Sequence, residues 1–243
     1  MKIAIISDVH ANLAALNAFP ETACDALWCI GDLVDYGPKP HEVILEVRNR
    51  ADVVVCGNHD YAVAASADPQ CPQAFRRLAA ETLFYTRQVC TDEDLDFLRN
   101  LPVYLEVKLA GTRFYLVHAM PTNPLFGYCA EASDQWEWEV KGLEADVLVV
   151  GHSHLPFVRR VGKTTIINPG SLGQSRTGRQ SACYAIWEDG QVSLREYKYP
   201  IVDTIRDIRG MSISSDDQDA LISVLQTGVL PLRHFMKVMA ASG

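Results

Sequence analysis

The 243-residue sequence predicts an α/β protein with a largely parallel β-sheet. Two observations lead to this prediction. Up to residue 60, apolar runs of strand length alternate with segments of helical pattern, which is the rhythm of βαβ units. Several of these runs also end in short turns that carry His, Asp or Asn, and parallel sheets place their functional side chains at the carboxyl ends of the strands.

The elements expected in this first segment alternate regularly. They are a strand at 2–7, a helix at 11–19, a strand at 26–30, a helix at 40–50 and a strand at 53–56, followed by a turn at 57–60. Pro20 ends the first helix because proline cannot continue it, and Gly31-Asp32 breaks the second strand.

Residues 60–101 have a helical pattern and are interpreted as a helical insertion beside the strand ends, with a capping box at Thr91–Asp94. Further strands and a helix follow. They are strands 102–108 and 112–117, a helix at 133–143, a strand at 147–150, and strands 157–161, 164–167, 182–187 and 192–198. Residues 200–243 are expected to form a helical C-terminal extension with Ser214 or Ser215 as a cap. Together, residues 1–243 are predicted to be a single domain.

The composition excludes several classes of partner. Lys and Arg total 22 against 30 Asp and Glu, and no basic block offsets the net charge of −8, so long nucleic acids and anionic membranes are poor candidates. No apolar run approaches the length of a membrane span, and Asp8 interrupts the apolar N-terminal run. The seven cysteines include no Cys-x-x-Cys pair, which favours a reduced, cytoplasmic protein.

Five turns share one pattern, in which an apolar strand ends in a tight segment that carries His, Asp or Asn. They are SDVH at 7–10, GDLVDYG at 31–37, GNHD at 57–60, VHAMP at 117–121 and GHSH at 151–154. These turns hold five of the seven histidines; His41 and His234 lie elsewhere and are interpreted as ordinary surface or packing residues. Imidazole and carboxylate ligands suit Mn, Fe, Zn or Ni, so the pattern indicates a metal site.

The spacing within two of the turns adds to this interpretation. Asp8 and His10 are two residues apart, and on an extended segment their side chains would point the same way. With the same spacing, His152 and His154 could each reach a different ion of a closely spaced pair.

The ordered set D-x-H, G-D, G-N-H-D, H and G-H-x-H, which spans residues 8–154, resembles the signature of the calcineurin-like metallophosphoesterase superfamily. The pattern G-D-x-V-D-Y-G-P and the segment NPGSLGQSRTG at 168–178 resemble a small prokaryotic phosphodiesterase or phosphatase branch. The resemblance implies a four-layer αββα sandwich, in which two mixed β-sheets are flanked by helices.

The resemblance also implies a centre with two divalent or transition metal ions, which could be Mn, Fe, Zn, Ni or Mg. The implied ligands are Asp8, His10 and His154 for one ion, Asn58, His118 and His152 for the other, and Asp32 for both. A hydroxide that bridges the ions would attack phosphorus. His59 would protonate or stabilise the leaving oxygen, and Asp35 would orient His59.

Four residues are candidate substrate contacts, although each has another interpretation. Asn12 could bind the ligand or start the first helix, and Tyr36 could stack on a base or aryl group or simply pack. Ser/Thr protein phosphatases and symmetrical diadenosine tetraphosphatases carry Arg at the position of Tyr36; Arg176 and Arg179 could replace that positive charge. Asp60, in contrast, is expected to cap the following helix.

The leading hypothesis is a metal-dependent phosphoesterase that hydrolyses a phosphodiester, a nucleotide or a small phosphomonoester. Within the superfamily, a dinucleoside polyphosphate hydrolase and a protein phosphatase are alternatives. A non-catalytic scaffold with the same fold is less favoured because no ligand and no GNH histidine is missing. A single-metal nuclease acting on long DNA conflicts with the acidic composition.

Overall fold

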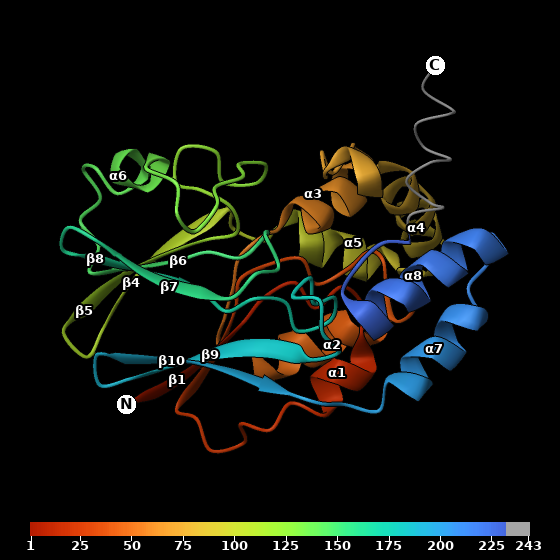
Figure 1. Ribbon diagram of the computed structural model, residues 1–243, viewed down its shortest axis with the longest axis horizontal. Coiled ribbons are helices and arrows are strands. Elements are labelled where there is room, and N and C mark those ends of the chain that lie inside the picture. Colours follow the sequence, from red (N-terminus) through yellow and green to blue (C-terminus); the bar gives the residue numbers. More distant parts are fainter. Residues whose placement is uncertain (232–243) are drawn as a thin grey trace.

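The computed structural model describes residues 1–231 and contains two five-stranded β-sheets packed face to face. The first sheet has the order β10 (Gln191–Tyr197), β9 (Ala182–Glu188), β1 (Lys2–Ile6), β2 (Ala26–Cys29) and β3 (Val53–Val54). The second has the order β4 (Tyr104–Leu109), β5 (Thr112–Val117), β6 (Val147–Val149), β8 (Thr164–Asn168) and β7 (Phe157–Val161). Figure 1 shows this arrangement.

Both sheets are mixed. In the first, β1, β2 and β3 are parallel, and β9 joins β1 antiparallel, with β10 antiparallel beyond it. In the second, β5, β6 and β8 are parallel, and β4 and β7 add antiparallel edges. The two mixed sheets implied by the resemblance are therefore confirmed. The single largely parallel sheet expected from the βαβ rhythm is wrong, because the later strands form hairpins that add antiparallel edges to both sheets.

Helices cover the outer faces of the sheets. They are α1 (Leu13–Asn17), α2 (Pro40–Arg50), α3 (Asn58–Ala65), α4 (Arg76–Val89), α5 (Asp92–Arg99), α6 (Gln135–Glu139), α7 (Ile201–Arg209) and α8 (Ser215–Thr227), with a 3₁₀ turn at Gln73–Phe75. In Figure 1, α6 lies beside the second sheet, and α3, α4, α5, α7 and α8 gather at the end opposite the hairpin tips. None of the helices within residues 1–231 is long and apolar enough to cross a membrane.

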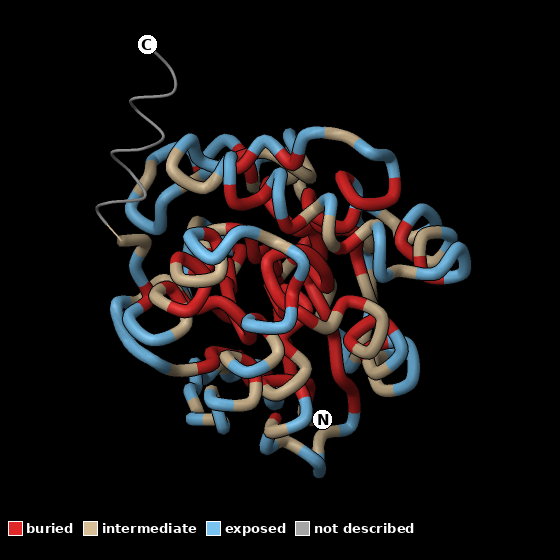
Figure 2. Tube along the Cα trace, turned by 90° about the vertical axis from the view of Figure 1, so that its right-hand side faces the viewer, coloured by how far each residue is buried: buried red, intermediate tan, exposed pale blue. Residues whose placement is uncertain are grey.

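The alternation of side chains along the strands builds the layers. On β1, Ile3 and Ile5 face the core between the sheets, whereas Ala4 and Ile6 face the helices. On β5, Phe114 contributes to the same central core, where its ring lies 4.9 Å from that of Trp28 and 5.2 Å from that of Trp187. Figure 2 shows the buried residues gathered at the centre of the molecule.

Several local expectations are confirmed, and some boundaries differ. Thr91 forms the capping box with Asp94, and Ser214 caps α8. The expected turn at 57–60 is wrong, because α3 already begins at Asn58, with the Asp60 side chain accepting from the backbone N–H of Gly57. Residues 200–231 hold α7 and α8; the rest of the predicted extension and His234 lie outside the described residues.

The inter-sheet core predicts a contrast between two phenylalanines. Phe114 is 1% exposed, so Phe114→Ala should lower the free energy of unfolding by about 3–5 kcal/mol through lost burial and a cavity. Phe84, on α4, is 61% exposed, and Phe84→Ala should change it by less than about 0.5 kcal/mol. Urea denaturation of both variants measures this; equal losses would contradict the placement of the core.

Candidate metal centre

The site is built where the strands end and their loops meet. The loops after β1, β2, β5 and β6, together with the first turn of α3, bring eight polar side chains together, each at most 4% exposed. They are Asp8, His10, Asp32, Asn58, His59, His118, His152 and His154. Such a concentration of buried charged and polar groups costs free energy unless the groups are paired or bind a cation.

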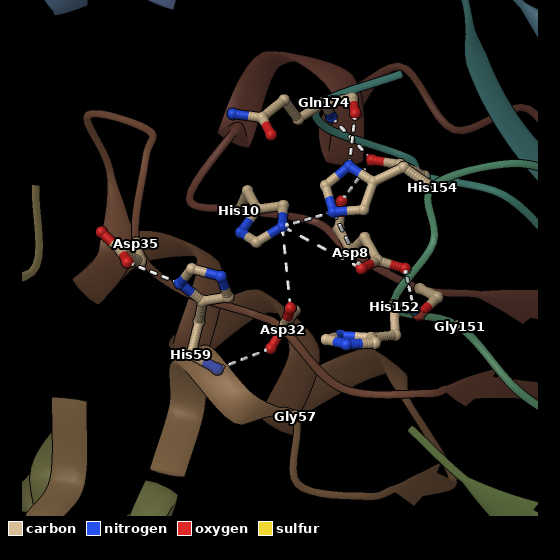
Figure 3. A network of polar contacts seen from close by, with 12 residues as sticks. Asp8, His10, Asp32, Asp35, Gly57, His59, Gly151, His152, His154 and Gln174 are labelled. Atoms are coloured by element: carbon tan, nitrogen blue, oxygen red, sulfur yellow. Dashed lines mark hydrogen bonds and ion pairs between the residues drawn. The ribbon is translucent and has the colours of Figure 1, made fainter. Parts of the chain in front are cut away.

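The carboxylates and imidazoles form two groups that share one residue. The first contains Asp8, His10, Asp32 and His154, the second contains Asp32, His118 and His152, and the ligand atoms of each group lie within 4.8 Å of one another. Figure 3 shows His10, His154, Asp8 and Asp32 pointing toward one another. The first group contains the three residues that the resemblance implies for one ion, the second contains two of the three implied for the other, and the shared Asp32 is the residue implied to bridge.

Asn58 belongs to the second group by position. Its amide nitrogen donates to the Pro69 carbonyl at 2.7 Å, which turns its Oδ1 toward the cluster. That oxygen lies 3.2 Å from His118 Nε2 and 3.0 Å from His152 Nδ1. All seven residues of the implied ligand set are therefore together.

Backbone carbonyls fix the orientation of three imidazoles. The Nδ1–H groups of His10, His118 and His154 donate to the carbonyl oxygens of Val34, Ile30 and Gln174 at 3.0, 2.6 and 2.6 Å, respectively. Because a carbonyl oxygen only accepts, each neutral ring carries its proton on Nδ1 and presents the lone pair of Nε2 to the cluster. This is the arrangement by which proteins orient metal-binding histidines.

The distances and the unpaired atoms fit cations. His10 Nε2 lies 3.1 Å from His154 Nε2, and in the neutral rings neither atom has a proton to donate to the other. His154 Nε2 is also 3.2 Å from Asp8 Oδ1, and His118 Nε2 is 3.1 Å from Asp32 Oδ2. Both carboxylate oxygens are buried without a hydrogen-bond partner. Nitrogen and oxygen ligands about 2.1 Å from one ion lie about 3–3.5 Å apart, so these spacings suit a shared cation.

Burial and neighbouring charges shift the pKa values of the residues in the cluster. Burial raises the pKa of Asp8 to about 7, and the nearby charge of Asp32 also raises it. Burial lowers the pKa of His118, but the charge of Asp32 outweighs this effect and its pKa is raised to about 10. Burial lowers the pKa of His154 well below its usual range, and the positive charge of Arg176 is the next largest cause.

The loop backbone corrects one step of the sequence interpretation. Asp8, His10, His152 and His154 lie beyond the ends of β1 and β6 and have left-handed φ angles of 53°, 46°, 67° and 59°, respectively. Alternation along an extended segment therefore does not bring these side chains together. Left-handed loop backbone does, and non-glycine residues adopt it at a cost.

The Asp60 side chain holds the GDLVDYG loop at 31–37 in place. Its carboxylate, which is fully buried, accepts from the backbone N–H groups of Asp32 and Leu33, each at 2.8 Å, and of Gly57 at 3.0 Å. The prediction that Asp60 caps the helix is confirmed, and the same side chain also fixes the loop that carries Asp32. Gly57 is required here because an added Cβ would lie 2.1 Å from Asp32 Oδ1.

His59 lies next to the cluster and is held by Asp35. Its Nδ1 is 2.6 Å from Asp35 Oδ2, its backbone N–H donates to Asp32 Oδ1 at 2.9 Å, and its ring lies 5.1 Å from that of His10. Figure 3 shows His59 between Asp35 and Asp32. Burial lowers the pKa of His59, but the charges of Asp32 and Asp35 outweigh it and raise the pKa above its ordinary value.

Two of the four candidate substrate contacts are used by the protein itself. Asn12 caps α1: its Oδ1 accepts from Ala15 N and Thr204 Oγ1, and its amide nitrogen donates to Gly173 O and Tyr199 Oη. Arg179 is exposed and pairs with Glu196 at 3.7 Å.

The other two candidates lie beside the cluster. Tyr36 is 1% exposed, and its ring lies 4.9 Å from His10 and 4.8 Å from His59. Arg176 is half-buried in the loop after β8, two residues beyond the carbonyl that holds His154. His41, interpreted as an ordinary histidine, pairs with Asp94 at 2.7 Å, away from the cluster.

Some groups that orient or contact the imidazoles of the site were not predicted from the sequence. The carbonyl oxygens of Ile30, Val34 and Gln174 orient the imidazoles, and backbone groups leave no residue-type signal in a sequence. Tyr128 was missed as well, although its ring lies 3.9 Å from that of His152. It is in the long loop between β5 and α6, where no local pattern marks it.

Residues 1–189 match the model of the calcineurin-like phosphoesterase superfamily domain. The chain belongs to this superfamily. An uncharacterized protein of Methanocaldococcus jannaschii is 32% identical over 85% of this chain and 88% of that protein. Phosphodiesterase YfcE of Escherichia coli K12 is 27% identical over 80% of this chain and 91% of its own. The symmetrical bis(5'-nucleosyl)-tetraphosphatase of Paracidovorax citrulli is 30% identical over 61% of this chain and 54% of its own.

Solved structures share the fold of this chain. A metallophosphoesterase from Sphaerobacter thermophilus superposes with a TM-score of 0.80 and 30% identity, covering 94% of this chain and all of that one. A hypothetical protein from Pyrococcus horikoshii gives a TM-score of 0.80 at 21% identity over 95% of this chain and 99% of its own, which supports the fold alone.

The role of Asp60 as a backbone anchor predicts a large loss of stability in Asp60→Asn. The substitution places amide N–H groups among buried backbone donors and should lower the free energy of unfolding by about 2–4 kcal/mol. Asp92→Asn, at the exposed start of α5, is the control and should cost less than about 1 kcal/mol. If chemical denaturation shows both variants equally stable, Asp60 does not hold the loop as described.

Proposed function

We propose that the protein is a dinuclear metal-dependent phosphoesterase that hydrolyses a small phosphodiester, nucleotide or phosphomonoester. The observation that carries this proposal is the pair of buried ligand groups that share Asp32, with unpaired oxygens on Asp8 and Asp32 directed into them. Such a cluster is costly without cations and suits two of them. Superfamily membership supports the chemistry of ester hydrolysis.

The ligands divide between two ions as the resemblance implies. Asp8, His10 and His154 would hold one ion, Asn58, His118 and His152 the other, and Asp32 both. When bound, the ions supply Lewis-acid charge for the phosphoryl oxygens and a lowered pKa for the attacking water. Mixed imidazole, carboxylate and amide ligands suit Mn, Fe, Zn or Ni better than Mg, which prefers oxygen.

His59 would supply the proton for the leaving oxygen. Asp35 holds its Nδ1 at 2.6 Å, so the other ring nitrogen carries the proton that is transferred, and the charges of Asp32 and Asp35 raise the pKa of His59, which favours the protonated ring. Asp35 thereby orients the donor and stabilises its charged form. The burial of both residues excludes water from this proton transfer.

The substrate proposal follows from the burial of the site and from the relatives. A phosphodiesterase and a dinucleoside tetraphosphatase are among the similar proteins, so both ester classes remain candidates. The near-complete burial of the cluster favours a slim phosphate ester over a folded protein substrate. The unpaired state of all seven cysteines supports a reducing, cytoplasmic setting.

Loss of a ligand should remove both metal and activity. Asp8→Asn and His152→Asn should each lower the bound metal and reduce hydrolysis of aryl phosphate mono- and diesters by at least about 100-fold, because the remaining ligands cannot hold both ions. Chelation of the wild type should abolish activity, and added Mn should restore it. His41→Asn is the control and should keep both properties. Full activity of Asp8→Asn would contradict the proposal.

The role of His59 predicts a dependence on the leaving group. His59→Asn should reduce kcat by about 100-fold or more for an alkyl phosphate ester, which needs a proton on its leaving oxygen, and far less for a nitrophenyl ester. Asp35→Asn should show the same pattern more weakly, and the double variant should be no slower than His59→Asn. Metal content, measured in parallel, should not change. Equal losses for both leaving groups would exclude a proton-donor role.

A further inference from the structure

Arg176 differs from the ion-paired arginines of this chain. Its guanidinium lies 4.1 Å above the ring of Phe75, and one terminal nitrogen donates to Gln174 Oε1 at 3.2 Å. Its Nε is buried and has no hydrogen-bond partner, and among residues 1–231 no carboxylate pairs with it. A half-buried guanidinium with unused donors is a site for an anion that the protein itself does not supply.

The loop that carries Arg176 is fixed directly to the metal centre. Ser171 Oγ and the backbone N–H of Gly173 both donate to the carbonyl oxygen of Asp8, at 2.7 and 3.0 Å. The carbonyl of Gln174 holds His154, as Figure 3 shows. The charge of Arg176 is therefore attached to the residues that hold one metal ligand group, and it acts electrostatically on His154.

Phe75 brings the predicted helical insertion into contact with Arg176. It ends the 3₁₀ turn before α4, and its ring lies 6.0 Å from that of Tyr36, which in turn contacts His10 and His59. The aromatic face thus fixes the guanidinium from the side of the insertion, while Gln174 fixes it from its own loop. Such double support reduces the entropy lost when the guanidinium binds a ligand.

We propose that Arg176 binds a non-bridging phosphoryl oxygen of the anion held at the metal centre, and that Phe75 is the positioning residue that holds the guanidinium for this contact. The inference rests on the proposed function. The ligand class is a tetrahedral phosphoryl anion, which a planar guanidinium recognises through paired N–H donors. It gives the helical insertion a role in substrate affinity.

The first experiment measures anion binding without catalysis. Inorganic phosphate is titrated calorimetrically into the metal-loaded wild type, Arg176→Gln and the control Arg48→Gln, whose guanidinium pairs with Glu93 and stacks on Phe97 away from the site. Arg176→Gln should raise the Kd about 10- to 100-fold at unchanged metal content, and Arg48→Gln should not change it. An unchanged Kd in Arg176→Gln would overturn the inference.

The second experiment separates positioning from folding. Phe75→Leu should raise the phosphate Kd about 3- to 10-fold relative to the wild type. Phe75→Trp keeps an aromatic face under the guanidinium, so its Kd should return to the wild-type value, and the matched Phe97→Leu should leave the Kd unchanged. In the Arg176→Gln background, Phe75→Leu should add nothing, because Phe75 acts through the guanidinium. A further loss in that background, or no rescue by Trp, would reject the positioning role.

The two proposals fail in different ways. If the metal-loaded wild type neither hydrolyses phosphate esters nor binds phosphate, the proposed function is wrong. If the wild type does both and Arg176→Gln does so equally well, only the inference about Arg176 is wrong.

Discussion

The carboxylate of Asp32 is the constraint on which the site depends. One of its oxygens lies 3.8 Å from His10 Nε2 and 3.1 Å from His118 Nε2, and the other accepts the backbone N–H of His59, so a single side chain sets the spacing of the proposed metal ligands and the proposed proton donor. Its own backbone is held by Asp60. The buried carboxylate of Asp60 thus anchors the loop that carries the buried carboxylate of Asp32, and a bound cation would balance the negative charge of the proposed metal centre.

The candidate ligand residues come together only because several of them adopt left-handed backbone conformations, which cost free energy. Residues held in such conformations are unfavourable by about 1–3 kcal/mol each and persist only where the surroundings determine them. Here the loops bind one another: Asp8 N–H donates to Gly31 O at 3.0 Å, His10 N–H to Asp32 O at 3.0 Å and Gly151 N–H to the carbonyl of His118 at 2.8 Å. The core between the sheets fixes the strand ends, so the strain is stored in the ligand loops.

The sequence was informative for features that depend on a few neighbouring residues of characteristic chemistry. His and Asp at the ends of apolar strands indicated a metal site, and Thr91 indicated its helix start, because both signals are local. The two mixed sheets followed from the family resemblance; the βαβ rhythm by itself did not indicate them, since strand pairing depends on contacts between distant residues. Nor could the sequence show that Asn12 would be used within the fold, because its partners Thr204 and Tyr199 lie far along the chain.

Elements without a chemical motif also shape the chemistry. Tyr36, at a position where Ser/Thr protein phosphatases and symmetrical diadenosine tetraphosphatases carry Arg, has a left-handed φ of 59° and packs in an apolar cluster with residues of α4, α7 and α8. A guanidinium at this position would be buried among apolar side chains, at a high cost. The half-buried cation instead comes from the loop of Arg176 and stacks on Phe75, beside the same cluster. The apolar cluster that excludes a charge at residue 36 thereby also holds the aromatic ring that receives one from another loop.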